Sequence, residues 1–229
     1  DAVEDHAPLA AHAPQAEVQT RAALAAELGA RKVWLAASTH AGEDEFALDA
    51  HEMLRRTFPD AVLVIVPRHP IRGADISELG GGAPRRSQHA AIGGAPIYVA
   101  DTLGELGVFY ELAPVSLVAG SLLPHLKGHN PVEPAKIGSA IVTGPYVESF
   151  QDLFDDLFAA GGAVKAATPE EIAEAVALLW RDDAQRTRQL NAARTVTAQG
   201  AEAFDETIAQ LGVLVSAPPR TPKAADASA

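Results

Sequence analysis

The chain has 229 residues, 48% of them apolar, which is enough for one large or two small domains with a packed core. Its 30 acidic residues exceed its 18 Lys and Arg residues and give a formal net charge of −12, with no basic stripe to offset it. This composition argues against nucleic-acid binding, which depends on Lys and Arg contacts to phosphate. The absence of cysteine excludes disulfides and thiolate sites, and no apolar run approaches the ~20 residues of a membrane span.

Strand and helix patterns alternate along the chain. The strand segments are apolar runs without polar alternation, and nearly every one is followed by a helical pattern, which is typical of a parallel sheet covered on both faces. The expected order is helix 15–28, strand 33–37, helix 43–57, strand 61–66, helix 71–79, strand 97–100, helix 103–112, strand 115–119, helix 131–137, strand 140–143, helix 149–159, strand 163–166 and helices 169–180 and 183–211. Residues 80–96 are expected to be mostly loop, with one edge strand near Arg85.

These elements predict an α/β, Rossmann-like domain over residues 15–215. A linker or disordered tail is expected at residues 1–14, and a Pro- and Ala-rich disordered tail at residues 216–229. The functional residues should lie in the loops at the carboxyl edge of the sheet, where open α/β sheets bind their ligands.

Two of these loops follow the first two predicted strands. In the first, Ser38 and Thr39 offer hydroxyls and Gly42 lets a ligand approach the backbone. The alternative for this loop is a helix N-cap followed by acidic residues that suit the helix dipole. In the second, Arg68 and His69 lie between two prolines and can bind phosphate or carboxylate, whereas the alternative is a surface turn with a solvated Arg.

A third loop, residues 120–131, is rich in Gly and Pro and leads from an apolar strand into a helix. We expect the backbone N–H groups at Gly120 and Ser121 to be unpaired and to point outward, which suits an anion or a nucleotide. Further along, Gly128 and His129 provide a flexible, polar approach to the helix.

The helix start itself reads Asn130-Pro131-Val132-Glu133. Asn130 is expected at the N-cap and the Glu133 carboxylate beside the helix N-terminus. The same geometry suits a carboxylate that accepts hydrogen bonds from ribose hydroxyls. We expect this segment and the Arg68 segment to border one site.

Two further segments have the spacing of a capping box. Thr102 and Glu105 follow the strand at residues 97–100, so a structural cap and a binding role for Thr102 and Leu103 both remain open. Thr168 and Glu171 are interpreted as purely structural. The histidines show no metal-binding spacing, and the chain has no Walker loop, so neither a metal nor a cofactor is expected.

Taken together, these loops resemble the C-terminal half of the 3-deoxy-D-manno-octulosonic acid (Kdo) transferases. The resemblance covers roughly residues 31–210 and is most specific around Asn130 and Glu133. Its segments are residues 33–43, 67–70, 101–106, 120–122, 128–135 and 144–145. Two departures concern the third loop: residues 124–128 read Pro-His-Leu-Lys-Gly where the family usually has Pro-His-Gly-Gly, and Ala119-Gly120 stands where it has a glycine pair.

The resemblance implies the donor-binding half of a GT-B glycosyltransferase that transfers Kdo from CMP-Kdo to a lipid A precursor in lipopolysaccharide biosynthesis. It implies that Arg68 and His69 meet the donor's phosphate or carboxylate. Asn130 and Glu133 would hold ribose or phosphate, and Thr102 with Leu103 would lie near the base. The implied donor-binding residues are Ser38, Thr39, Arg68, His69, Thr102, Leu103, Gly120, Ser121, Gly128, His129, Asn130 and Glu133.

In this family the N-terminal half binds the lipid acceptor and supplies the catalytic base. We therefore expect no catalytic residue in this chain, and membrane association only through that other half, at the cytoplasmic face of the bacterial inner membrane. Two alternatives remain open. One is a GT-B transferase or epimerase half that uses a UDP-sugar, and the other is a noncatalytic nucleotide-binding module.

Overall fold

The computed structural model describes the backbone of residues 15–216 and the side chains of residues 18–199. The tails expected at residues 1–14 and 216–229 lie outside the described residues, apart from Ser216, which ends the last helix. Within the described part of the chain, no helix is long and apolar enough to cross a membrane.

Six strands pair in parallel to form one sheet. They are β1 (Val33–Thr39), β2 (Val62–Pro67), β3 (Ile97–Val99), β4 (Val115–Val118), β5 (Ala140–Thr143) and β6 (Ala163–Lys165). Their order across the sheet is β3-β2-β1-β4-β5-β6, so the winding direction reverses between β1 and β4. The four central strands are almost entirely buried, as their Val-, Leu-, Ile- and Ala-rich sequences require. The predicted α/β fold is confirmed.

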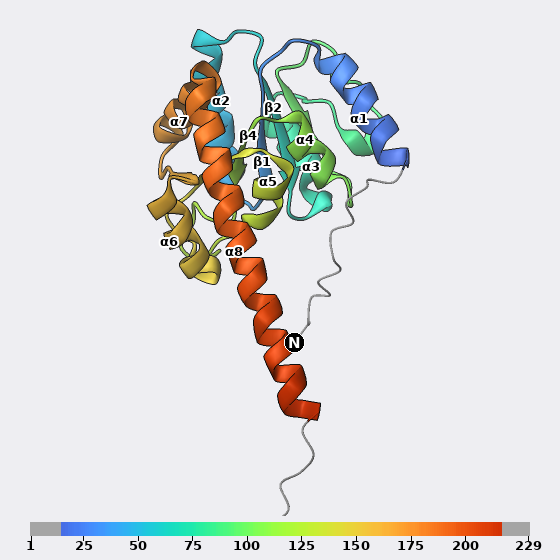
Figure 1. Ribbon diagram of the computed structural model, residues 1–229. Helices are drawn as coiled ribbons and strands as arrows, with labels where there is room; N and C mark the ends of the chain where they lie inside the picture. The colour runs from blue at the N-terminus through green and yellow to red at the C-terminus, as the bar shows by residue number, and fades with distance from the viewer. Residues whose placement is uncertain (1–14, 217–229) are drawn as a thin grey trace, which may run out of the picture.

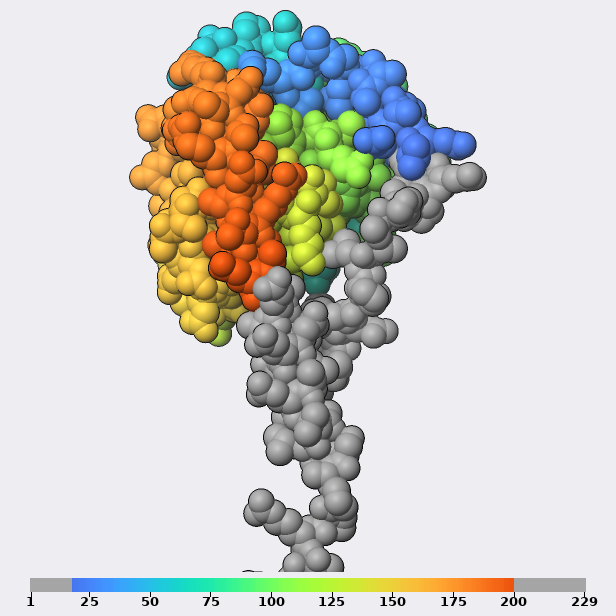
Figure 2. All heavy atoms as spheres, in the orientation of Figure 1, coloured from blue at the N-terminus to red at the C-terminus, as the bar shows by residue number. Residues whose placement is uncertain are grey.

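Helices cover both faces of this sheet (Figure 1). The helices are α1 (Gln15–Leu28), α2 (Glu43–Thr57), α3 (Gly73–Leu79), α4 (Leu106–Leu112), α5 (Val132–Ile137), α6 (Gln151–Ala160), α7 (Pro169–Arg181) and α8 (Asp183–Ser216). Helices α2, α3 and α7 contribute to the apolar cluster on one face. Helices α1 and α4, and then α5, α6 and α8, form the clusters on the other. Figure 2 shows this second face, with α1, α4, α5 and α8 side by side.

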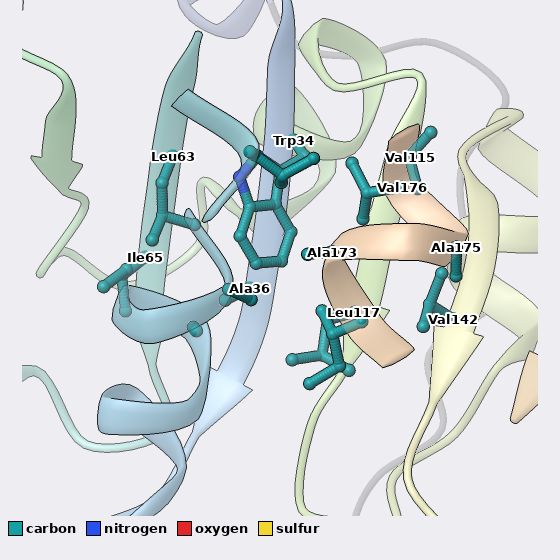
Figure 3. Packing of buried hydrophobic residues seen from close by; sticks show 14 of the residues in the cluster. Trp34, Ala36, Leu63, Ile65, Val115, Leu117, Val142, Ala173, Ala175 and Val176 are labelled. Carbon is teal, nitrogen blue, oxygen red and sulfur yellow. The ribbon is translucent and has the colours of Figure 1, made fainter. Parts of the chain in front are cut away.

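Successive residues of β1 point to opposite faces, and Trp34 anchors the α7 side. Figure 3 shows Trp34 between Leu63 of β2 and Val176 of α7. Its indole Nε1 donates a hydrogen bond to His51 Nδ1 of α2 at 3.1 Å. His51 Nε2 in turn donates to the Pro96 carbonyl at 2.8 Å. Burial lowers the pKa of His51 to about 4, so this imidazole is neutral and serves the core.

The two predicted capping boxes differ in outcome. At α7 the Thr168 cap forms, because Thr168 Oγ1 accepts from the Glu171 amide at 3.3 Å, and the Glu171 carboxylate accepts at 2.6 Å from the amide of Ala167, one residue before the N-cap. At α4 the box does not form, and the helix begins at Leu106 rather than at residue 103. The Thr102 hydroxyl donates to the Glu105 carboxylate instead of capping an amide.

The neighbouring loop explains why the second box fails. Arg86 donates two hydrogen bonds to the Glu105 carboxylate, at 2.8 and 3.1 Å, and so competes for the group that a capping box needs. Gly104, between Thr102 and Glu105, has φ +81°, and this left-handed conformation prevents the helix from starting before it. The edge strand expected near Arg85 is a single parallel bridge between Arg85 and Val99.

Candidate functional site

Three loops meet at His40, at the carboxyl edge of the sheet beside the β1–β4 reversal. The His40 ring stacks on the His129 ring at a centroid distance of 5.1 Å, with their Nε2 atoms 3.0 Å apart. The His69 ring meets His40 edge-on at 6.0 Å. Because His69 follows β2 and His129 belongs to the loop after β4, the Arg68 segment and the Asn130 segment border one site. This agrees with the expectation from the sequence.

The surroundings of His40 favour the neutral form of its imidazole. Burial lowers the pKa of His40, the neighbouring Glu43 carboxylate opposes this shift, and the nearby His69, Arg68 and Arg72 add to it. A hydrogen bond between two ring nitrogens needs one N–H and one lone pair, so one of the two facing Nε2 atoms is unprotonated. The other presents its proton to that lone pair.

Arg72 holds the loop after β2 in place. Its guanidinium donates to the fully buried carboxylate of Asp44 and, at 3.3 Å, to the Thr39 carbonyl. The same carbonyl accepts the Arg68 amide at 3.0 Å. These contacts fasten the loop to the end of β1 while the side chains of Arg68 and His69 stay exposed at the sheet edge. Sequence analysis missed Arg72, because its partner in the first turn of α2 was explained by the helix dipole.

The expectation of unpaired amides after β4 is wrong. The Glu43 carboxylate, fully buried at the start of α2, accepts hydrogen bonds from the amides of Gly120, Ser121 and Leu122 at 2.8, 2.9 and 3.0 Å. It also accepts from the His40 amide at 3.0 Å. These N–H groups therefore point to a carboxylate of the protein itself and are not available to a ligand.

Four of the twelve residues implied by the resemblance are buried and shape the loops around the site. Thr39 and Ser121 are 0% exposed. The Ser121 hydroxyl donates to the Val118 carbonyl at 2.8 Å and accepts from the Gly144 amide at 2.7 Å. Gly120 and Gly128 are the other two buried positions, both with positive φ.

Glycine is required at both positions for two reasons: the backbone has a positive φ, and a neighbouring residue lies too close for a Cβ. A Cβ at Gly120, whose φ is +73°, would lie 2.6 Å from His129 Nε2. A Cβ at Gly128, whose φ is +90°, would lie 2.8 Å from the Cα of Val147. No side chain fits at either position without displacing its neighbour, so the two glycines fix the path of the loop that carries His129.

The helix start after this loop differs by one residue from the prediction. Helix α5 begins at Val132 with Pro131 at the N-cap, and the exposed Asn130 accepts the Val132 amide through Oδ1 at 2.9 Å. Glu133 lies half-buried in the first turn, against Gly107 of α4. Burial raises the pKa of Glu133, because the ionised carboxylate loses hydration there.

Three further residues implied by the resemblance, Ser38, Thr102 and Leu103, lie around the site. Ser38 is half-buried at the end of β1 and has a left-handed backbone, with φ +59°. Thr102 is also half-buried, and Leu103 is 82% exposed. Both follow β3, which lies two strands from β1, so they stand further along the same edge.

The buried Asp101 carboxylate holds Arg85 and Ser87, from the loop before β3, against this part of the sheet edge. The Asp101 carboxylate accepts from Arg85 at 2.7 and 2.9 Å and from the amide and hydroxyl of Ser87 at 2.9 and 2.8 Å. Burial alone would raise the pKa of Asp101, but these hydrogen bonds and the Arg85 charge hold it below its ordinary value. Among the side chains of residues 18–199, no group of three or more His, Asp or Glu is arranged to hold a metal ion.

Solved structures share this fold. The C-terminal domain of a group 1 family glycosyl transferase (LpcC) from Francisella tularensis matches 82% of this chain and 93% of its own with a TM-score of 0.53, at 13% identity. The fold and the loops gathered at the sheet reversal define a C-terminal domain of the GT-B glycosyltransferase class. The C-terminal CMP-Kdo binding domain of WaaA from Acinetobacter baumannii is more similar, with a TM-score of 0.74 and 28% identity over 80% of this chain and 98% of that one.

No family model matches the sequence, but curated relatives do. A probable mitochondrial 3-deoxy-D-manno-octulosonic acid transferase from Arabidopsis thaliana is 40% identical over 164 residues, 68% of this chain and 37% of the relative. The Bordetella pertussis 3-deoxy-D-manno-octulosonic acid transferase is 33% identical over 204 residues, 85% of this chain and 47% of the relative. The chain belongs to the Kdo transferase family and corresponds to its C-terminal half. It spans less than half the length of these relatives.

Proposed function

We propose that this chain is the donor-binding part of a transferase that moves Kdo from CMP-Kdo to a lipid A precursor in lipopolysaccharide biosynthesis. The observation that carries the proposal is the meeting of the Arg68-His69 loop and the His129-Asn130 loop at His40, beside the reversal of the sheet. The similarity to a solved CMP-Kdo binding domain supports the choice of donor.

The charges of the site suit a sugar nucleotide that leaves as CMP. When the bond from the sugar to the phosphate oxygen breaks, negative charge accumulates on the phosphate. Arg68 and His69 are exposed where they can bind that phosphate or the Kdo carboxylate, and His129 can donate a further hydrogen bond. Preorganised donors of this kind stabilise the leaving group and so lower the barrier.

The remaining side chains of the site would recognise the nucleoside. Glu133, half-buried at the start of α5, accepts hydrogen bonds from the ribose hydroxyls, with Asn130 beside it. Ser38 lines the site, and Thr102 with Leu103 provides a surface for the base. The buried Thr39, Gly120, Ser121 and Gly128 act by shaping the loops. In this proposal the donor-binding domain comprises residues 15–215.

Acceptor binding and the catalytic base are proposed to come from the part of the relatives' length that this sequence does not span. The chain on its own then binds donor without turnover, because a base must reach the attacking hydroxyl. The full-length protein is proposed to act at the cytoplasmic face of the bacterial inner membrane and to associate with the membrane through that other part. The similarity to a putative UDP-N-acetylglucosamine 2-epimerase, at 12% identity and a TM-score of 0.50, concerns the fold alone and does not favour a UDP-sugar.

Isothermal titration calorimetry with CMP and UMP tests this proposal. We expect CMP to bind more tightly than UMP, and Arg68→Glu to abolish binding while the circular dichroism spectrum stays unchanged. Arg188→Glu is the matched control, because it makes the same charge change at an exposed position of α8 beside β6. Absence of binding by folded protein at millimolar CMP would contradict the proposal, and tighter binding of UMP than of CMP would point to a uridine nucleotide.

A further inference from the structure

The buried Glu43 carboxylate accepts four backbone hydrogen bonds beside the site. Oε2 accepts from the amides of His40 and Gly120 at 3.0 and 2.8 Å, and Oε1 accepts from those of Ser121 and Leu122 at 2.9 and 3.0 Å. Glu43 is 0% exposed, and its helix begins directly after the loop that carries His40. One side chain therefore joins the loop after β1 to the loop after β4, across the reversal of the sheet.

The positions of the His40 and His129 rings both depend on this junction between the two loops. The His40 amide is bound by Glu43 directly. His129 is placed through Gly120, whose amide Glu43 also binds and whose Cα side packs so closely on the His129 ring that a Cβ would lie 2.6 Å from Nε2. In addition the Gly128 amide donates to the Gly120 carbonyl at 2.7 Å, which closes the loop between Gly120 and His129.

We propose that Glu43 is a positioning residue for donor binding. This inference rests on the proposed function. The carboxylate occupies the ring of amides formed by His40, Gly120, Ser121 and Leu122, and so fixes the backbone that carries the His40 and His129 rings. Because these amides are already bound, the anionic groups of the donor are bound by side chains instead. A hydrogen bond from an amide to a carboxylate is stronger than one to a neutral oxygen, so four of them hold the junction rigidly.

Glu43→Gln is the informative change, because it keeps the size of the side chain and replaces one acceptor oxygen by a donor. The new NH2 group then faces two backbone N–H groups. We expect the dissociation constant for CMP to rise by about tenfold or more, which corresponds to the loss of at least one hydrogen bond to a charged group. Glu45→Gln is the matched control at an exposed position of the same helical turn, and it should bind CMP as the wild type does.

A second control separates positioning from general stability. Leu179→Ala removes a fully buried side chain from α7 and should lower the midpoint of urea unfolding, because it leaves a cavity in the core. We expect it to leave CMP affinity unchanged under conditions where it is folded. If Glu43→Gln does not fold, Glu43→Asp replaces it: the charge stays, but the shorter side chain cannot reach all four amides, so CMP affinity should still fall.

Chemical rescue gives a readout that is specific to the carboxylate. Glu43→Ala empties the ring of amides, and added formate should restore part of the CMP affinity by entering it, whereas chloride at equal ionic strength should not. NMR signals of the amides at residues 120–122 and of the His40 ring should shift in Glu43→Gln and recover with formate in Glu43→Ala.

The outcomes separate this inference from the proposed function. If the wild type binds CMP and Glu43→Gln binds it equally well, the positioning role is wrong and the donor site stands. If the folded wild type does not bind CMP, the proposed function fails. Unchanged amide and His40 signals in Glu43→Gln would then overturn the positioning role as well.

Discussion

Replacing Gly120 by Ala should damage the site in two ways that can be measured apart. The residue has φ +73°, where an L-amino acid costs about 1–2 kcal/mol relative to glycine. In addition, the new Cβ would lie 2.6 Å from His129 Nε2, whereas ordinary contacts begin at 3.4 Å. The ring must therefore move by about 1 Å, which is enough to break the hydrogen bond that His129 would donate to the donor's phosphate in the proposed complex.

The expected loss of affinity follows from that broken bond. A hydrogen bond to a charged group contributes about 1.5–3 kcal/mol, so CMP should bind about 10- to 150-fold more weakly to Gly120→Ala. Gly81→Ala is the matched control, because Gly81 has φ +71° but a Cβ there meets no atom within 4 Å. It should lose a similar amount of stability to backbone strain and keep its CMP affinity.

Urea unfolding and calorimetry with CMP on both variants provide the assay. Equal CMP affinities of the two alanine variants, together with equal losses of stability, would refute the reasoning. That result would mean that the His129 ring either moves without consequence or does not contact the donor.

Three further predictions concern ionisable side chains that are buried or half-buried in the fold. His51→Gln should weaken the pH dependence of stability. The pKa of His51 is about 4 in the folded protein and 6.5 in the unfolded chain, so the free energy of unfolding of the wild type should fall by about 3 kcal/mol between pH 6.5 and pH 4. Urea unfolding measures this decrease, which should be smaller in the variant. Glu133→Gln should raise the free energy of unfolding at pH 7, because burial raises the pKa of this carboxyl and its ionised form is disfavoured in the fold, while CMP affinity falls by about tenfold. An increase in both quantities would remove Glu133 from the site. Asp101→Asn breaks the buried ion pair with Arg85, so it should lower the free energy of unfolding by about 3 kcal/mol or more. Amide hydrogen exchange at residues 85–88 should become faster, and an unchanged exchange rate there would contradict the role given to Asp101.

The order of strands and helices could be predicted because each element has a local signal. Continuous apolar runs as short as residues 61–66 are typical of strands buried on both faces, and the helices between them carry apolar residues at helical spacing. The loops with Arg68 and Asn130 could be placed together for the same reason, because parallel strands end at one edge of the sheet.

The errors arise where a side chain has a local explanation and a distant partner. Glu43 in the first turn of α2 suits the helix dipole, yet its carboxylate binds amides 77 to 79 residues away. Glu105 has capping-box spacing, yet Arg86, 19 residues earlier, takes its carboxylate. Spacing in the sequence does not reveal such competition, which is decided only when the strands bring the loops together.

Chemical-shift mapping with CMP on isotope-labelled protein tests the central claim most directly. The donor site predicts saturable shifts at residues 38–43, 67–72 and 128–133, together with the ring signals of His40 and His129. Shifts confined to the opposite edge of the sheet, or no shift at millimolar CMP in the folded protein, would contradict it.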